Sequence, residues 1–133
     1  AQAAAYVREN NIRFSVAFGP SVLENGSIRI PEDYPWGENY ETYARALLSQ
    51  VGKLHYLFLC ANCREEGFDR FTTEEAARLM IDHGCTMAYA LDGGQTAEVV
   101  FHDRVINTPE FENERQVSDV ICFASALPKG GSA

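Results

Sequence analysis

Met87-Ala88-Tyr89-Ala90-Leu91-Asp92-Gly93-Gly94 is the most informative stretch of this chain. Its apolar part predicts a buried strand, and its end predicts a tight, exposed turn that carries a carboxylate. Paired glycines allow backbone N–H groups to approach an anion closely, and an acid beside them can hold a proton, a sugar hydroxyl or a metal ion. The alternative is that Asp92 accepts hydrogen bonds from the backbone of its own turn.

A helix is predicted just before this strand. Thr72-Thr73-Glu74-Glu75 has the pattern of a capping box, and apolar residues follow it at helical spacing. Gly84 suits the position after the last helical turn. The sequence therefore predicts a helix over about 73–83 and a buried strand over 85–91.

The other predicted elements are mostly strands joined by short turns. Residues 1–10 are expected to form a short helix, and residues 12–18 alternate as in a half-buried strand. Further strands are predicted at 21–23, 27–30, 45–48, 54–60 and 120–124, with a hairpin over 96–101 and 104–107. One main helix between runs of strands predicts an α+β fold, with a mostly antiparallel sheet and the helix packed on it.

The size and charge of the chain narrow the class of protein. Its 133 residues suffice for one domain with a core, so we expect a single domain over 1–133, with 1–10 and 129–133 peripheral. Because it opens at Ala1 and not at Met, we expect an N-terminally truncated piece of a longer protein.

The net charge of −8 argues against nucleic acid and anionic membranes as partners. No apolar run approaches the ~20 residues of a membrane span.

The four cysteines leave three interpretations open. Cys60 and Cys63 form a C-x-x-C pattern, but Cys60 ends an apolar strand and no second pair follows; the others are Cys85 and Cys122. Structural thiols are favoured over a disulfide and over a metal or redox site.

Three stretches, in order, resemble motifs of the phosphodiester glycosidase family. Phe18 to Gly26 resembles its Phe-Gly-Pro hairpin, and Leu91 to Gly94 with Val105 to Pro109 resembles its aspartate–glycine core. Glu114 to Ser118 resembles a third element that ends in Val-Ser. The resemblance covers roughly Phe14 to Ala124. It implies hydrolysis of a sugar-1-phosphodiester, such as an N-acetylglucosamine-1-phosphodiester, at an extracellular or cell-surface location.

The chain also departs from the family pattern. Gln95, Ala97 and Glu98 stand where the family has glycine, serine and threonine, and Asn62 stands where it has an aspartate. Gln116 replaces a proline, and an upstream Asn-Gly-Gly element is missing. These changes keep a second hypothesis open, a non-catalytic module that binds a saccharide or a cell-wall glycopolymer. The missing N-terminal part of its own domain is a further candidate partner.

The chemistry of a sugar phosphodiester selects the candidate residues. The glycosidic bond calls for carboxyl groups, for which Asp92 and Glu98 are the candidates. The phosphate calls for guanidinium groups, backbone amides and hydroxyls, and the candidates are Arg45, Arg64, Arg115, Gly93, Gly94, Thr96 and Ser118. No cofactor and no metal ligand is predicted, although a divalent cation is left open.

Each assignment has a structural alternative. The arginines can form surface ion pairs, Glu98 can be a solvent-facing strand residue, and the glycines can serve a tight turn. Tyr34, Trp36 and Tyr40 can stack on a sugar ring or pack over the core.

Overall fold

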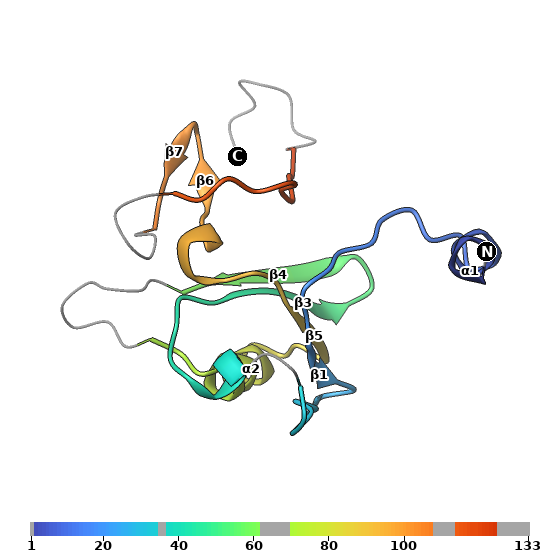
Figure 1. The fold of residues 1–133 in the computed structure, drawn as a ribbon, viewed down its shortest axis with the longest axis horizontal. Helices are drawn as coiled ribbons and strands as arrows, with labels where there is room; N and C mark the ends of the chain where they lie inside the picture. The colour runs from blue at the N-terminus through green and yellow to red at the C-terminus, as the bar shows by residue number, and fades with distance from the viewer. Residues whose placement is uncertain (1, 35–36, 62–69, 108–113, 125–133) are drawn as a thin grey trace.

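The computed structural model describes residues 2–34, 37–61, 70–107 and 114–124 (Figure 1). In chain order its elements are α1 (Gln2–Glu9), β1 (Ser21–Glu24), β2 (Ser27–Ile28), the 3₁₀ turn η1 (Gly37–Tyr40), β3 (Ala46–Gly52), β4 (His55–Cys60), α2 (Thr73–Asp82), β5 (Met87–Ala90), the 3₁₀ turn η2 (Gly94–Thr96), β6 (Val100–Phe101) and β7 (Arg104–Val105).

Five strands form one sheet in the order β2-β1-β5-β3-β4, and every pairing in it is antiparallel. The strand β5 lies in the middle, where Ala88 pairs with Ser49 of β3 and with Leu23 of β1. A separate two-stranded ribbon joins β6 and β7. The predicted α+β class with a mostly antiparallel sheet is confirmed.

The main core lies between one face of this sheet and α2. Leu47 of β3 and Ala88 of β5 pack with Ala76, Ala77 and Met80 of the helix. Removing these side chains from water is the main favourable contribution to folding. Figure 1 shows α2 on one side of the sheet, and the β6–β7 ribbon and the C-terminal segment on the other.

The helix α2 begins as the sequence predicts. The Thr72 hydroxyl accepts a hydrogen bond from the Glu75 amide at 3.2 Å, and the Glu75 carboxylate accepts one from the Thr72 amide at 2.8 Å. This reciprocal pair satisfies two amides that the first turn leaves unpaired. At the other end Gly84 takes a φ of +79°, the left-handed conformation that glycine adopts at low cost.

Two predicted strands are absent from the structure. Residues 12–18 have an alternating pattern, but they are exposed and form no ladder with any described strand. Residues 120–124 are exposed as well, although the Phe123 ring lies 4.7 Å from the Phe58 ring of β4. A strand requires a neighbour for its backbone groups, and apolar alternation alone does not supply one.

Smaller corrections concern element boundaries. The central strand runs over Met87–Ala90 and not over 85–91, and the start of the predicted hairpin at Thr96 lies inside η2.

Within the described part of the chain, no helix is long and apolar enough to cross a membrane.

Candidate active site

The sheet brings Asp92 to the end of β5, beside the start of β3. The Leu91 amide donates to the Ala46 carbonyl at 2.9 Å, so the β5–β3 ladder continues up to the turn. One Asp92 oxygen, Oδ1, accepts a hydrogen bond from the Gly93 amide at 3.0 Å. The other, Oδ2, accepts from Nη2 of Arg115 in an ion pair. Both interpretations of Asp92 are thus present, a cap of its own turn and a carboxylate beside a guanidinium group.

This ion pair joins segments that are distant in sequence. The Arg115 side chain keeps 53% of its surface exposed and that of Asp92 keeps 41%, so both remain open to solvent. Arg115 and the Gly93 amide together fix the orientation of the Asp92 carboxylate at the end of β5. It can act as a base, as a nucleophile or as an electrostatic stabiliser in this geometry.

The two glycines have structural tasks in this turn. A Cβ on Gly93 would lie 2.5 Å from the Ala44 carbonyl oxygen, which is too close for any side chain. Gly94 has a φ of +61°, and its amide donates to that same Ala44 carbonyl at 3.0 Å. The Gly93 and Gly94 amides therefore already donate within the chain, to Asp92 and to Ala44.

Glu98 follows this turn and lies in a different environment from Asp92. Its Oε1 atom is buried and has no hydrogen-bond partner among the described residues. Burial and the nearby charge of Glu114 raise the pKa of the Glu98 carboxyl. Burial and the charge of Glu98 in turn raise the pKa of the Cys60 thiol to about 11. Glu98 is therefore close enough to Cys60 at the end of β4 and to Glu114 for these charges to interact.

Small side chains explain how these segments approach one another. Ala44 and Ala97 are fully buried and pack with Ala46 and Cys60 in a second, smaller cluster. Asn107 supports the segment after η2, because its side chain accepts from the Val99 amide and donates to the Ala97 carbonyl, each at 2.7 Å. Asn107 belongs to one of the resembling motifs, but the sequence did not indicate this bridging role.

The other phosphate-binding candidates do not all lie at the Asp92 turn with their polar groups available. The Arg45 backbone lies beside Gly93, but its guanidinium donates to the carbonyls of Phe71 at 3.1 Å and Glu41 at 2.6 Å. The Thr96 hydroxyl donates to the Gly93 carbonyl at 2.9 Å. Ser118 is exposed in the same segment as Arg115, and Arg64 lies outside the described residues.

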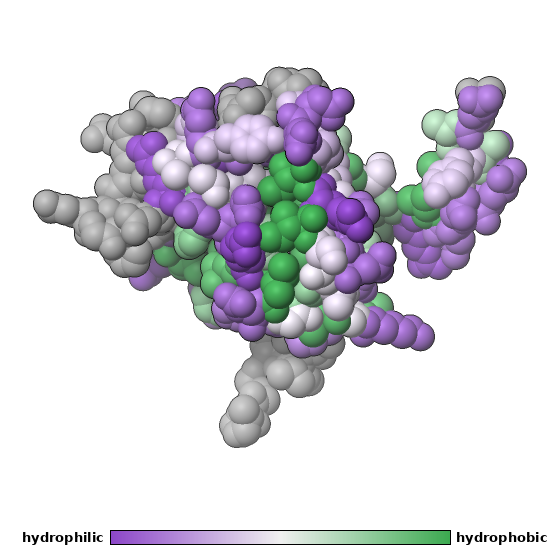
Figure 2. All heavy atoms as spheres, turned by 90° about the horizontal axis from the view of Figure 1, so that it is seen from below, coloured by the Kyte–Doolittle hydropathy of each residue, from purple (hydrophilic) through white to green (hydrophobic). Residues whose placement is uncertain are grey.

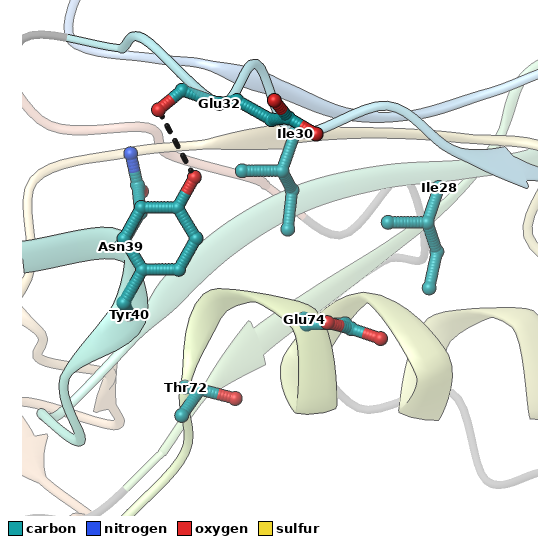
Figure 3. Close-up of a pocket in the computed structure, with 7 residues that line it drawn as sticks. All are labelled: Ile28, Ile30, Glu32, Asn39, Tyr40, Thr72 and Glu74. Atoms are coloured by element: carbon teal, nitrogen blue, oxygen red, sulfur yellow. Dashed lines mark hydrogen bonds between the residues drawn. The ribbon is translucent and has the colours of Figure 1, made fainter.

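A separate pocket of about 450 Å³ lies between β2, residues 30–32, residues 39–40 and the start of α2 (Figure 3). Its lining residues are Ile28, Ile30, Glu32, Asn39, Tyr40, Thr72 and Glu74, and none of the site candidates is among them. Tyr40 was a candidate for stacking on a sugar ring or for packing over the core. It lines this pocket and is not at the Asp92 turn. Tyr34 donates its hydroxyl hydrogen to the Phe18 carbonyl at 2.6 Å, and Trp36 lies outside the described residues.

The metal-ligating residue types are dispersed where the structure describes them. Within 2–34, 37–61, 70–107 and 114–124, no three His, Cys, Asp or Glu side chains gather as a metal site. In those ranges Cys60, Cys85 and Cys122 are free thiols, and Cys63 is not described.

Comparison with known families gives the class of protein to which this fold and turn belong. The phosphodiester glycosidase family matches residues 2–124. The chain therefore belongs to the phosphodiester glycosidase family.

Solved structures support the fold of the chain. A crystal structure of a hypothetical protein from Synechocystis matches 68% of this chain with a TM-score of 0.56 and 17% sequence identity. The match spans 17% of the length of that protein, so the comparison concerns one portion of it. No curated protein matches the chain significantly.

Proposed function

We propose that this chain contributes the catalytic turn of a hydrolase that cleaves a sugar-1-phosphodiester, for which an N-acetylglucosamine-1-phosphodiester is the first substrate to test. The family supports the reaction class, and one observation supports the residues. Asp92 and Glu98 are close in sequence but lie in contrasting environments: Asp92 is paired with Arg115, whereas the Oε1 atom of Glu98 is buried and has no hydrogen-bond partner among the described residues. A carboxylate beside a guanidinium group and a second carboxyl whose pKa burial raises are suited to act as base and acid.

The roles follow from these environments. Glu98, whose pKa is raised by burial and by Glu114, retains its proton to a higher pH and can donate it to the oxygen that leaves the sugar. Asp92, oriented by its ion pair with Arg115, stabilises the positive charge that develops at the sugar carbon or activates water. Arg115 is also exposed enough to contact the phosphate, which supports its assignment as a substrate-binding residue.

The experiment is a turnover assay with a synthetic N-acetylglucosamine-1-phosphodiester that follows release of the free sugar. Asp92→Asn and Glu98→Gln should each lower kcat by about a hundredfold or more, the usual contribution of an acid–base group. Asp103→Asn, a matched change at an exposed turn between β6 and β7, should leave it unchanged. Activity that survives both site substitutions would refute the assigned roles.

The second candidate function is a binding module that retains the fold without the chemistry. It is favoured by the engagement of the Gly93 and Gly94 amides within the chain and by Glu98 in place of a smaller family residue. Calorimetry with phosphodiester-linked saccharides separates the two functions. Binding that Arg115→Ala abolishes, without any sugar release, would support the module and refute the hydrolase.

A further inference from the structure

Glu98, the acid of the proposed reaction, lies on a backbone segment that its neighbours hold in place. Its amide donates to the Thr96 carbonyl at 3.1 Å, across an Ala97 whose φ of −79° and ψ of +83° are those of an inverse γ-turn. The Thr96 amide and hydroxyl in turn donate to the Gly93 carbonyl at 3.2 and 2.9 Å. A continuous series of hydrogen bonds therefore connects the Asp92 turn to the backbone of Glu98.

The β6–β7 ribbon brings a further side chain to this point. Both residues of its turn have a positive φ, the conformation that a tight two-residue hairpin requires. Val100 pairs with Val105 across the ribbon, and the same register, continued by two residues away from the turn, sets Asn107 opposite Glu98. The ribbon lies on the side of the sheet away from α2 (Figure 1), so Asn107 reaches Glu98 from outside the main core.

The side-chain amide of Asn107 binds the backbone on both sides of Glu98. Its Oδ1 accepts from the Val99 amide and its Nδ2 donates to the Ala97 carbonyl, each at 2.7 Å. Both hydrogen bonds are partly buried, and Ala97 is fully buried. A side chain must carry a donor and an acceptor close together to make both bonds at once, as the amide of asparagine does. We call these two hydrogen bonds the Asn107 clamp.

The position of the Glu98 carboxyl depends on its backbone. Its Oε1 atom is buried and has no hydrogen-bond partner among the described residues, so no described hydrogen bond of this atom fixes the carboxyl in place. The charges that act on it or on which it acts are those of Glu114 and of Cys60 at the end of β4. Burial of an unpaired polar group is unfavourable, so the carboxyl would turn toward water if its backbone were released.

We propose that Asn107 is a positioning residue of the hydrolase, which holds the Glu98 carboxyl in its buried place by binding the backbone on either side of it. The role of Asn107 in turnover rests on the proposed function, whereas the clamp itself is a feature of the fold. A displacement of a reacting group by about 1 Å can lower a rate by about a hundredfold. The clamp therefore affects turnover without any contact between Asn107 and the substrate.

The first measurement is a carbon-13 NMR titration of the Glu98 carboxyl, which requires no substrate. In Asn107→Ala the pKa of Glu98 should fall from its raised value toward 4.5, because the released carboxyl reaches water. Asn107→Ser, a milder change with a side chain too short for both bonds, should shift this pKa in the same direction. Asn25→Ala is the matched control at an exposed turn position with a φ of +51°. It strains the fold at a distance and should leave the pKa of Glu98 unchanged.

The second measurement is the turnover assay. Asn107→Ala should lower kcat by about tenfold to a hundredfold with little change in KM, and it should move the alkaline limb of the kcat profile to lower pH. In a Glu98→Gln background the same substitution should cost almost nothing further, because the group that it positions is already absent.

Two results would overturn the proposal: an equal cost of Asn107→Ala in both backgrounds, or a Glu98 pKa that neither Asn107 variant moves. A parent without turnover would refute the hydrolase, and the titration would then decide by itself whether Asn107 holds Glu98 in place.

Discussion

Gly93 is the residue at which the backbone of the candidate site is packed most tightly. Its missing side chain allows the Ala44 carbonyl to approach, and the Gly94 amide then binds that carbonyl. The glycine therefore maintains the distance between the Asp92 turn and the segment before β3. Any Cβ at this position must displace backbone atoms, which cannot move as a flexible side chain would.

The substitution Gly93→Ala should lower the free energy of unfolding by about 1–3 kcal/mol, the usual cost of overpacking. Urea denaturation measures this change. Gly52→Ala is the matched control, since a Cβ there would meet no atom within 4 Å. Equal effects of the two substitutions would contradict the close approach at Gly93.

Glu98 should make the stability of the fold depend on pH. Its pKa is raised from an ordinary value of 4.5 by burial and by Glu114, so the folded state retains this proton to a higher pH than the unfolded chain. The stabilisation is complete below pH 4.5 and is lost as the pH rises through the pKa of the folded state. In thermal melts the midpoint temperature of Glu98→Gln should therefore rise relative to that of the parent as the pH increases from 4 to neutrality. A difference between the two midpoints that stays constant with pH would contradict the raised pKa of Glu98.

Cys60 should react slowly with alkylating agents. Only the thiolate is nucleophilic, and burial together with the charge of Glu98 raises the pKa of this thiol to about 11. Mass spectrometry after iodoacetamide treatment near pH 8 should find the exposed Cys122 modified well before Cys60. The Glu98→Gln substitution should speed modification of Cys60, because it removes the neighbouring charge.

At the scale of an element, α2 depends on its first turn. The capping box between Thr72 and Glu75 starts the helix, and the apolar residues that follow bury it against β1, β3 and β5. A helix of this length is marginal in isolation, so the cap and the packing act together.

The substitution Thr72→Ala should lower the free energy of unfolding by about 1 kcal/mol, because an amide of the first turn loses its acceptor. Chemical denaturation checks the value, with Thr42→Ala at an exposed loop position as the control. The hydrogen bonds from Thr72 lower the pKa of Glu75, so they stabilise the fold above pH 4.5 and are lost as the pH falls through the lowered pKa. The cost of Thr72→Ala should accordingly shrink in acid.

At the scale of the whole molecule, the sheet and α2 form two packed layers, and the chain is acidic overall. Figure 2, seen from the α2 side, shows a narrow hydrophobic strip between hydrophilic residues. The chain is small and carries a net charge of −8, so it repels polyanions at long range. We expect this repulsion to exceed the local attraction between a polyanion and the few arginines of the chain.

The protein should therefore show no measurable retention by duplex DNA or by phosphatidylserine vesicles at physiological salt. Fluorescence anisotropy and vesicle co-sedimentation test this, with a basic protein as the positive control. Binding that disappears at high salt would contradict the prediction and would indicate a basic patch on the surface.

Local signals in the sequence were sufficient for most elements. The capping box at Thr72, the helix end at Gly84 and the neighbouring strands predicted at 21–23 and 27–30 each depend on adjacent residues, and the structure confirms each of them. The apolar run from Met87 to Leu91 also predicted that Asp92 follows the end of a buried strand. The α+β class follows from these elements, because they alternate in the order that an antiparallel sheet with one helix requires.

Only the tertiary structure decided which residues meet. The ion pair between Asp92 and Arg115, the burial of Glu98 beside Cys60 and Glu114, and the approach of Ala44 to Gly93 all join residues from different segments. The same holds for residues 12–18 and 120–124, whose pattern predicts strands but which pair with no strand in the part of the chain that the structure describes. Periodicity and caps are properties of a few adjacent residues, whereas pairing and burial depend on how distant segments fold together.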